Sequence, residues 1–226
     1  MSKGILGLGC SYTWGEGLYF YSDLDELPFR EVHTFDSKTV RKSMELFKDK
    51  HRYLQKVADY LDTWCWSDYC NGGSQWDSVQ YVDELEEKYN FKYNDFSLVI
   101  LQFSQHFRKF NEFDFDIEKQ ILEIDLRLKK FEELNIKTLT ISWDFDITNH
   151  PTYKKLFKER HVDLIYEDKT YEHFYDLTKE NKYGLSIASD FSDRGLQKND
   201  EHFNLKGHKM VAESIIKKLD IDRNRI

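Results

Sequence analysis

The stretch SLVILQFS, residues 97–104, is the clearest predicted strand in this chain of 226 residues. Its continuous apolar run is typical of a strand in a sheet whose two faces are both covered. Two similar runs, KGILGLG at 3–9 and KTLTISWDF at 137–145, predict further strands. A shorter strand is expected within WCWSDYCNGG, 64–73, which runs into a glycine turn.

Between and after these strands, the sequence predicts helices whose apolar side chains recur at the helical period. Ser74 is suited to cap the second of them. Because strands and helices alternate without a Pro- or Gly-rich linker, we expect one α/β domain over 1–226 with a mostly parallel sheet. The predicted helices cover 38–62, 74–89, 115–134, 170–180 and 207–219.

The composition indicates a soluble globular protein, with 40% hydrophobic and 33% charged residues. A net charge of −8 without a run of like charges argues against a nucleic-acid partner, which needs a basic face. The cysteines at 10, 65 and 70 form no disulfide framework, which favours free thiols in a reducing compartment. No leader and no membrane-length apolar run is recognised, so a cytoplasmic location is expected. We expect no metal and no cofactor.

The loop GLGCSYTWGEG, 7–17, follows the first predicted strand, where ligands of parallel sheets bind. It fits neither dinucleotide nor P-loop patterns, because Tyr12 replaces the third glycine and no Gly-Lys-Ser/Thr occurs. The elbow of α/β-hydrolases also fails at Thr13. What remains is Ser11, either a helix cap or a nucleophile. A nucleophilic serine needs a base, and His202 lies in a polar turn before the last helix.

Four segments resemble the conserved blocks of the SGNH, or GDSL-like, hydrolases. GCSYTWG, 9–15, is similar to the first block, Gly-Asp-Ser-x-Thr-x-Gly, and NGGS, 71–74, to the second. LVILQFSQHFR, 98–108, falls where the third block, Gly-x-Asn-Asp, would lie. DEHFNLKGHKMVAE, 200–213, resembles the histidine turn, Asp-x-x-His-Pro-Asn-x-x-Gly-His. Order and spacing agree over nearly the whole chain, and divergent SGNH-like proteins of tailed phages are the nearest in pattern.

The resemblance implies a three-layer α/β/α sandwich, SGNH or flavodoxin-like, with a mostly parallel sheet of about five strands. It also implies that Ser11 is the nucleophile and His202 the general base. Backbone N–H groups of Ser11 and Gly73 would form two arms of an oxyanion hole. Where the third block has asparagine, this chain places Ser104, whose hydroxyl is the expected third donor.

The first and last blocks differ from the family pattern. The aspartate of the first block is Cys10, which we expect to remain a buried thiol. The position three residues before the histidine is Asn199 rather than aspartate. We favour Asp200 as the group that orients His202, and a backbone carbonyl is the alternative, which would leave a Ser-His dyad.

Four further residues are expected to contact substrate: Trp14, Ser74, Gln102 and Arg108. The expected function is hydrolysis of an acyl ester or thioester on a small molecule or glycan, by an esterase or acetylesterase of SGNH type. The alternative is a binding or structural protein that keeps this fold without turnover. A nucleotide-binding doubly wound domain is disfavoured because phosphate motifs are absent.

Overall fold

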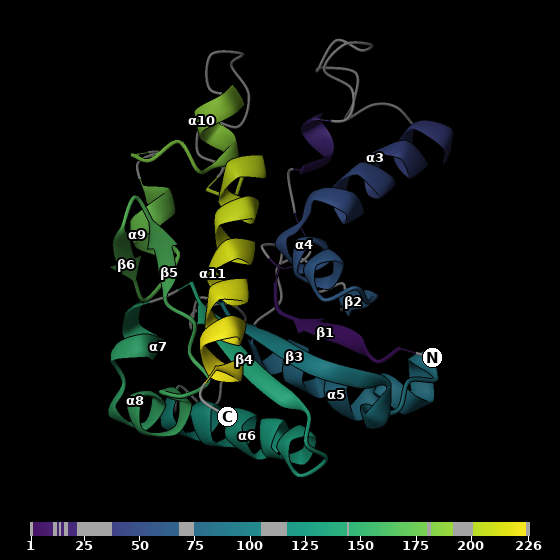
Figure 1. Cartoon of the computed structure of the whole chain (residues 1–226), viewed down its shortest axis with the longest axis vertical. Coiled ribbons are helices and arrows are strands. Elements are labelled where there is room, and N and C mark those ends of the chain that lie inside the picture. Colours follow the sequence, from purple (N-terminus) through teal and green to yellow (C-terminus); the bar gives the residue numbers. More distant parts are fainter. Residues whose placement is uncertain are drawn as a thin grey trace, which may run out of the picture.

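The computed structural model describes residues 2–10, 13, 15, 18–21, 38–67, 75–104, 117–143, 145–179, 182–191 and 201–224. These residues form an α/β fold in which helices cover both faces of a parallel sheet (Figure 1). The sheet has four strands in the order β2-β1-β3-β4, and all three pairings are parallel. The strands are β1 (Gly4–Leu8), β2 (Cys65–Ser67), β3 (Phe96–Phe103) and β4 (Lys137–Ser142).

The remaining elements fall into three groups. The helices of eight residues or more are α3 (Lys38–His51), α4 (Tyr53–Tyr60), α5 (Gln75–Tyr89), α6 (Ile117–Glu132) and α11 (Leu205–Arg223). The shorter ones are η1 (Leu18–Tyr21), η2 (Tyr93–Asp95), α7 (Phe145–Asn149), α8 (Pro151–Phe157), α9 (Tyr175–Thr178) and α10 (Ile187–Phe191). Strands β5 (Leu164–Tyr166) and β6 (Lys169–Tyr171) pair as a separate antiparallel hairpin.

Alternation along the strands divides the core between the two faces of the sheet, because successive strand side chains point to opposite sides. In β3, Leu98 and Ile100 pack with α4 and α11, whereas Val99 and Leu101 pack with α5, α6 and α8. Figure 1 shows α4 and α11 on one side of the sheet and α5 and α6 on the other. Burial on both faces explains the unbroken apolar run of β3.

The expected α/β fold with a mostly parallel sheet is confirmed, and among the described residues this sheet has four strands where about five were expected. A fifth position beside β4 holds a single parallel bridge, between Thr140 and His161. The Thr140 N–H donates to the Arg160 carbonyl, and the Val162 N–H donates to the Thr140 carbonyl, each at 2.8 Å. The chain then leaves the sheet and forms the β5–β6 hairpin.

The helix predicted over 38–62 is two helices. At Arg52 the backbone has φ −64° and ψ 152°, an extended conformation that ends α3 and begins α4. The apolar periodicity of the sequence continues across this break and therefore does not reveal it. The break leaves the first N–H of α4, at Tyr53, free to bond outside its own helix.

The helix predicted over 170–180 is also corrected. Lys169–Tyr171 is strand β6, and only one short helix, α9, follows at Tyr175–Thr178. The cause lies in the preceding turn, where Glu167 and Asp168 have φ of 48° and 60°. Two consecutive left-handed residues form the tight turn that suits an antiparallel hairpin.

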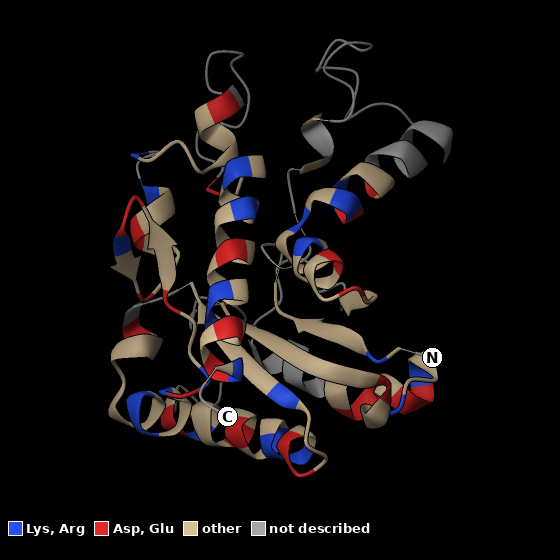
Figure 2. Ribbon diagram, viewed as in Figure 1, with Lys and Arg blue, Asp and Glu red and all other residues tan. Residues whose placement is uncertain are grey.

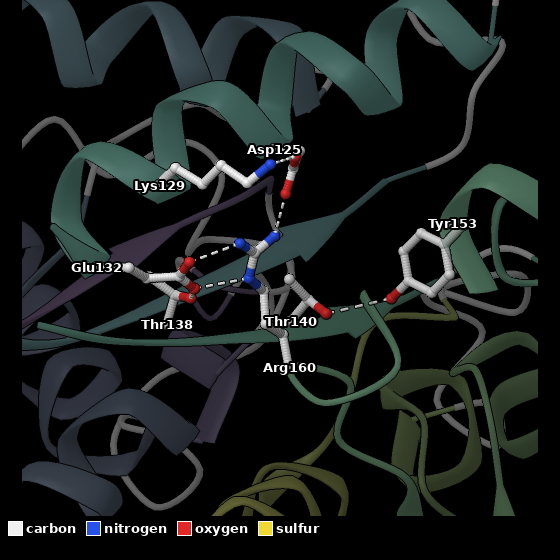
Figure 3. A network of polar contacts seen from close by, with 7 residues as sticks. All are labelled: Asp125, Lys129, Glu132, Thr138, Thr140, Tyr153 and Arg160. Carbon is white, nitrogen blue, oxygen red and sulfur yellow. Dashed lines mark hydrogen bonds and ion pairs between the residues drawn. The ribbon is translucent and has the colours of Figure 1, made fainter. Parts of the chain in front are cut away.

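A polar network ties the end of α8 to α6 and β4 (Figure 3). The Arg160 guanidinium donates to both carboxylate oxygens of Glu132, each at 2.7 Å, and to Asp125 at 2.5 Å. Lys129 pairs with Asp125 at 2.6 Å, and the Thr138 hydroxyl donates to Glu132. The same turn supplies the Arg160 carbonyl to the sheet, so this network holds the fifth sheet position in place.

Basic and acidic residues are interspersed along α6 and α11 (Figure 2). Neither helix therefore presents a long strip of one charge. Within the part of the chain that the structure describes, no helix combines the length and the apolar character needed to cross a membrane.

Candidate active site

The carboxyl edge of the parallel sheet gathers residues from β1, β3 and β4. Cys10 follows β1, Ser104 follows β3, and Trp143 follows β4. The Trp143 N–H donates to the Phe103 carbonyl at 2.9 Å, which aligns the ends of β3 and β4. This edge is the usual ligand-binding side of a parallel α/β sheet.

The described residues on either side of Ser11 are fixed by a buried polar network. The Thr13 hydroxyl donates to the Gln102 side-chain oxygen at 2.7 Å, and the Gln102 amide donates to the Cys10 sulfur at 3.2 Å. Since the single Thr13 hydrogen goes to Gln102, the Tyr53 hydroxyl donates to Thr13 Oγ1, at 2.9 Å. Burial raises the pKa of Tyr53 well above its usual value, so this hydroxyl keeps its proton.

Gly9 is required by the close packing of this network. A Cβ at this position would overlap Thr13 Oγ1 and lie 2.9 Å from the Cβ of Gln102. Gly15 is required for a different reason, because its φ of +87° lies in the region that favours glycine. Gly9 and Gly15 are therefore needed for the conformation and packing of the loop that follows β1.

The histidine turn is held by the segment that precedes α10. The Ile187 N–H donates to the His202 carbonyl at 2.7 Å, and Phe203 forms an antiparallel bridge with Ser186. Asn204 is the N-cap of α11, and its side-chain oxygen accepts from the Gly207 N–H at 2.9 Å.

Gly207 allows α11 to approach this segment closely. A Cβ here would lie 2.6 Å from the Leu185 carbonyl oxygen and 2.5 Å from a ring carbon of Phe203. Phe203 in turn packs edge-on against Phe174, with ring centroids 4.8 Å apart. The Phe174 N–H donates to the carbonyl of Ser142, the last residue of β4, so the histidine turn lies at the carboxyl edge of the sheet.

His208 caps the start of α4. Its Nδ1 accepts the first N–H of α4, from Tyr53, at 3.2 Å, and its ring stacks on the Tyr53 ring. Complete burial lowers the pKa of His208 to about 3, with a smaller contribution from His202. His208 is therefore neutral at physiological pH and carries its proton on Nε2.

Two sets of hydrogen bonds join the segment after β1 to the histidine turn. The first passes from Thr13 through Tyr53 to His208. The second passes through Asp190 of α10, which accepts from the Tyr21 hydroxyl and, at 3.1 Å, from the Asn204 amide. The two parts of the chain that carry the predicted nucleophile and base are thus connected at one edge of the sheet.

A pair of cations also borders the loop after β1. Lys48 and Arg52 both approach Gly15, and the Arg52 guanidinium donates to Ser67 at the end of β2. Burial lowers the pKa of Lys48, although Glu45, at 2.5 Å, opposes that shift. The sequence analysis did not include these two residues in the site. The sign of them in the sequence was a pair of cations, four residues apart, on the apolar face of the predicted helix.

The predicted site residues divide into those that the structure describes and those outside it. Ser104 is buried at the end of β3, and His202 is half-buried in its turn. Gln102 is fully buried with both ends of its amide engaged, so a contact with substrate would require the amide to leave the network. Outside the described residues lie Ser11, Trp14, Gly73, Ser74, Arg108, Asn199 and Asp200.

The two described cysteines, Cys10 and Cys65, are free thiols. Burial raises the pKa of Cys65, and nearby Arg52 partly opposes this. Among the residues in the described ranges, no cluster of three or more histidine, cysteine or acidic side chains is placed to hold a metal ion.

The comparisons with known proteins include a distant structural likeness. No family model matches the chain. No curated protein matches it either. A solved structure from Desulfitobacterium hafniense DCB-2, proposed to be a lipolytic protein of the G-D-S-L family, aligns over 96% of this chain and 99% of that chain. The TM-score is 0.48 and the sequence identity 13%, a likeness too distant to say anything about activity.

Proposed function

We propose that this protein is a serine hydrolase of SGNH type that cleaves an acyl ester, with Ser11 as nucleophile and His202 as general base. The observation that carries the proposal is the double connection between their segments, through Tyr53 and through Asp190. A catalytic serine and histidine must lie within hydrogen-bond reach, and a scaffold that fixes both segments favours such a geometry.

The proposed reaction is acyl transfer in two steps. The Ser11 hydroxyl attacks the ester carbonyl while His202 accepts its proton, and the resulting imidazolium protonates the leaving alcohol. Water then attacks the acyl-serine as His202 takes its proton, and the imidazolium returns that proton to Ser11 Oγ as the acid is released. Backbone N–H groups of Ser11 and Gly73, with the Ser104 hydroxyl, would stabilise the oxyanion in both steps.

The electrostatic setting of the histidine turn supports this role. Because burial holds the pKa of His208 at about 3, that residue adds no positive charge beside His202. A charged neighbour would oppose formation of the imidazolium on which the proposed mechanism depends. We assign the orientation of His202 to Asp200, which is two residues away in the chain.

Trp14, Ser74 and Arg108 are proposed to line the substrate site, with the ester carried on a small molecule or a glycan. The alternative proposal is a protein that keeps this fold and binds its ligand at the same place but does not catalyse a reaction. The departures from the family pattern at Asn199 and Ser104 motivate that alternative.

A serine-reactive fluorophosphonate and p-nitrophenyl acetate test the proposal directly. The wild type is expected to be labelled on Ser11 and to hydrolyse the ester, whereas Ser11→Ala and His202→Ala should lose both properties. Ser97→Ala is a matched control, because Ser97 lies at the start of β3, at the opposite end of the sheet. Labelling that persists in Ser11→Ala would overturn the nucleophile assignment, and a wild type that neither labels nor turns over would favour the binding protein.

A further inference from the structure

We infer that Tyr53 is a positioning residue that holds the nucleophile loop and the histidine turn in one fixed relation. The inference rests on the proposed function and adds to it a residue outside every block of the SGNH pattern. Tyr53 is the first residue of α4 and is fully buried. It reaches both segments at once, through different atoms.

Its side chain holds the nucleophile loop. The Tyr53 hydroxyl donates to Thr13 Oγ1 at 2.9 Å, and Thr13 passes its own hydrogen to Gln102. Thr13 lies two residues beyond Ser11, so a displacement of Thr13 is transmitted to Ser11 through a short stretch of backbone. Since Thr13 is also fully buried, water cannot replace the lost donor without entering the core.

Its backbone holds the start of α11. The Tyr53 N–H donates to His208 Nδ1 at 3.2 Å, and the two rings stack with centroids 6.0 Å apart. His208 lies six residues beyond His202, in the first turns of the helix that the histidine turn begins. The break between α3 and α4 at Arg52 is what leaves this N–H available.

Two contacts from one rigid residue matter because acyl transfer depends strongly on the relative placement of nucleophile and base. A misplacement of about 1 Å can lower a rate by about a hundredfold. The Tyr53 side chain supports one partner and its backbone supports the other, so removal of the hydroxyl should uncouple the nucleophile loop without disturbing the cap on α4.

The substitution Tyr53→Phe separates the side-chain contact to Thr13 from the backbone contact to His208. It removes the hydroxyl but keeps the ring and the backbone N–H. We expect kcat for p-nitrophenyl acetate, and the rate of fluorophosphonate labelling, to fall by about two- to tenfold, the effect of one net hydrogen bond. KM should change little. Thr13→Val should cause a similar loss, Thr13→Ser should restore the rate, and the double variant Thr13→Val with Tyr53→Phe should be no slower than Thr13→Val alone.

Tyr153→Phe is the matched control that the chain offers. Tyr153 is also a buried tyrosine whose hydroxyl meets a threonine, Thr140 at 3.2 Å, and a histidine, His161 at 2.8 Å. It belongs to α8 on the other face of the sheet. Tyr153→Phe should lower the melting temperature about as much as Tyr53→Phe while leaving kcat unchanged.

A merely structural role would make the two tyrosine variants alike in both stability and kcat, and that result would overturn the inference. If the wild type is labelled but Tyr53→Phe reacts at the wild-type rate, the inference fails while the proposed function stands. If the wild type does not react at all, hydrogen exchange still decides. Amides of residues 9–18 should then exchange faster in Tyr53→Phe than in Tyr153→Phe, and equal exchange would refute the positioning role.

Discussion

Replacement of Arg160 by methionine should lower the free energy of unfolding by about 3 kcal/mol. The Arg160 side chain is 11% exposed, and its guanidinium makes three charge-assisted hydrogen bonds to Glu132 and Asp125, at 2.5–2.7 Å (Figure 3). Removing one partner of a buried ion pair costs about 3–5 kcal/mol. We expect the lower end, because Asp125 keeps its pair with Lys129 and Glu132 is 35% exposed.

The assay is urea denaturation at pH 7 followed by circular dichroism, with the slope of the transition checked for a two-state process. In a chain of this length, the same loss corresponds to a fall of about 6–12 °C in melting temperature. Arg160→Lys keeps the charge but cannot bond both oxygens of Glu132 in the same plane, so it should lose an intermediate amount.

Arg127→Met is the control for this experiment. Arg127 pairs with Glu123 and Asp83 on the surface, where both acids are 38% exposed or more. Such pairs contribute at most about 1 kcal/mol. A loss in Arg160→Met that is no larger than the loss in Arg127→Met would refute the argument that burial makes the Arg160 network strong.

The same network predicts a pH dependence. Burial disfavours the charged form of Glu132, but hydrogen bonds from Arg160 and Thr138 outweigh burial and hold its pKa below the usual value. A carboxyl whose pKa is lower in the folded state stabilises the fold above its unfolded pKa, and loses that contribution as pH falls through the folded pKa. Arg160→Met should therefore weaken the decline in stability on acidification below about pH 4.5.

Three further predictions concern the histidine turn and are checked by denaturation and by fluorophosphonate labelling. Gly207→Ala should cost about 1–3 kcal/mol and slow labelling, because its Cβ would overlap Phe203 and the Leu185 carbonyl; unchanged stability would show that the turn can relax. Asn204→Ala should cost about 1–2 kcal/mol through the lost cap on α11, while Asn204→Asp should keep most of the cap. Below about pH 6.5, His208 takes up a proton in the unfolded chain but not in the folded protein, where it is buried. The free energy of unfolding should therefore fall by about 1.4 kcal/mol per pH unit toward pH 3. A flat profile in the wild type, or the same slope in His208→Asn, would contradict this.

Sequence reasoning located the strands of the sheet because burial on both faces leaves an unmistakable composition. KGILGLG, SLVILQFS and KTLTISWDF coincide with β1, β3 and β4, each to within a few residues at its ends. It missed the break at Arg52 because an apolar period reports which face is buried, not whether the backbone is continuous. The Tyr53 N–H that the break exposes donates to His208. Because His208 is 156 residues from Arg52 in the chain, no local sequence pattern indicates this contact.

The hairpin was missed for a related reason. Glu167 and Asp168 adopt left-handed conformations without the Asn-Gly or Asp-Gly pair that usually announces such a turn. At the site, motif order pointed to the strand-end loop and the histidine turn, but the hydrogen bonds among Thr13, Tyr53 and Gln102 join three distant segments. Which hydroxyl donates to which amide depends on side-chain packing in three dimensions, and periodicity carries no information about it.

The outer edges of the sheet have a consequence for association between molecules. An exposed strand edge offers unpaired backbone groups to which a second chain can add, a common start of aggregation. Here β2 is only three residues long, and on the other side the N–H and carbonyl of Thr140 in β4 are already bonded to the 160–162 segment. Lys137, at the start of β4, adds a charge at that edge, paired with Asp222 of α11. Because the 160–162 segment already bonds the outer edge of β4, few backbone groups there are open to a strand of a neighbouring molecule. This disfavours extension of the sheet from one molecule to the next.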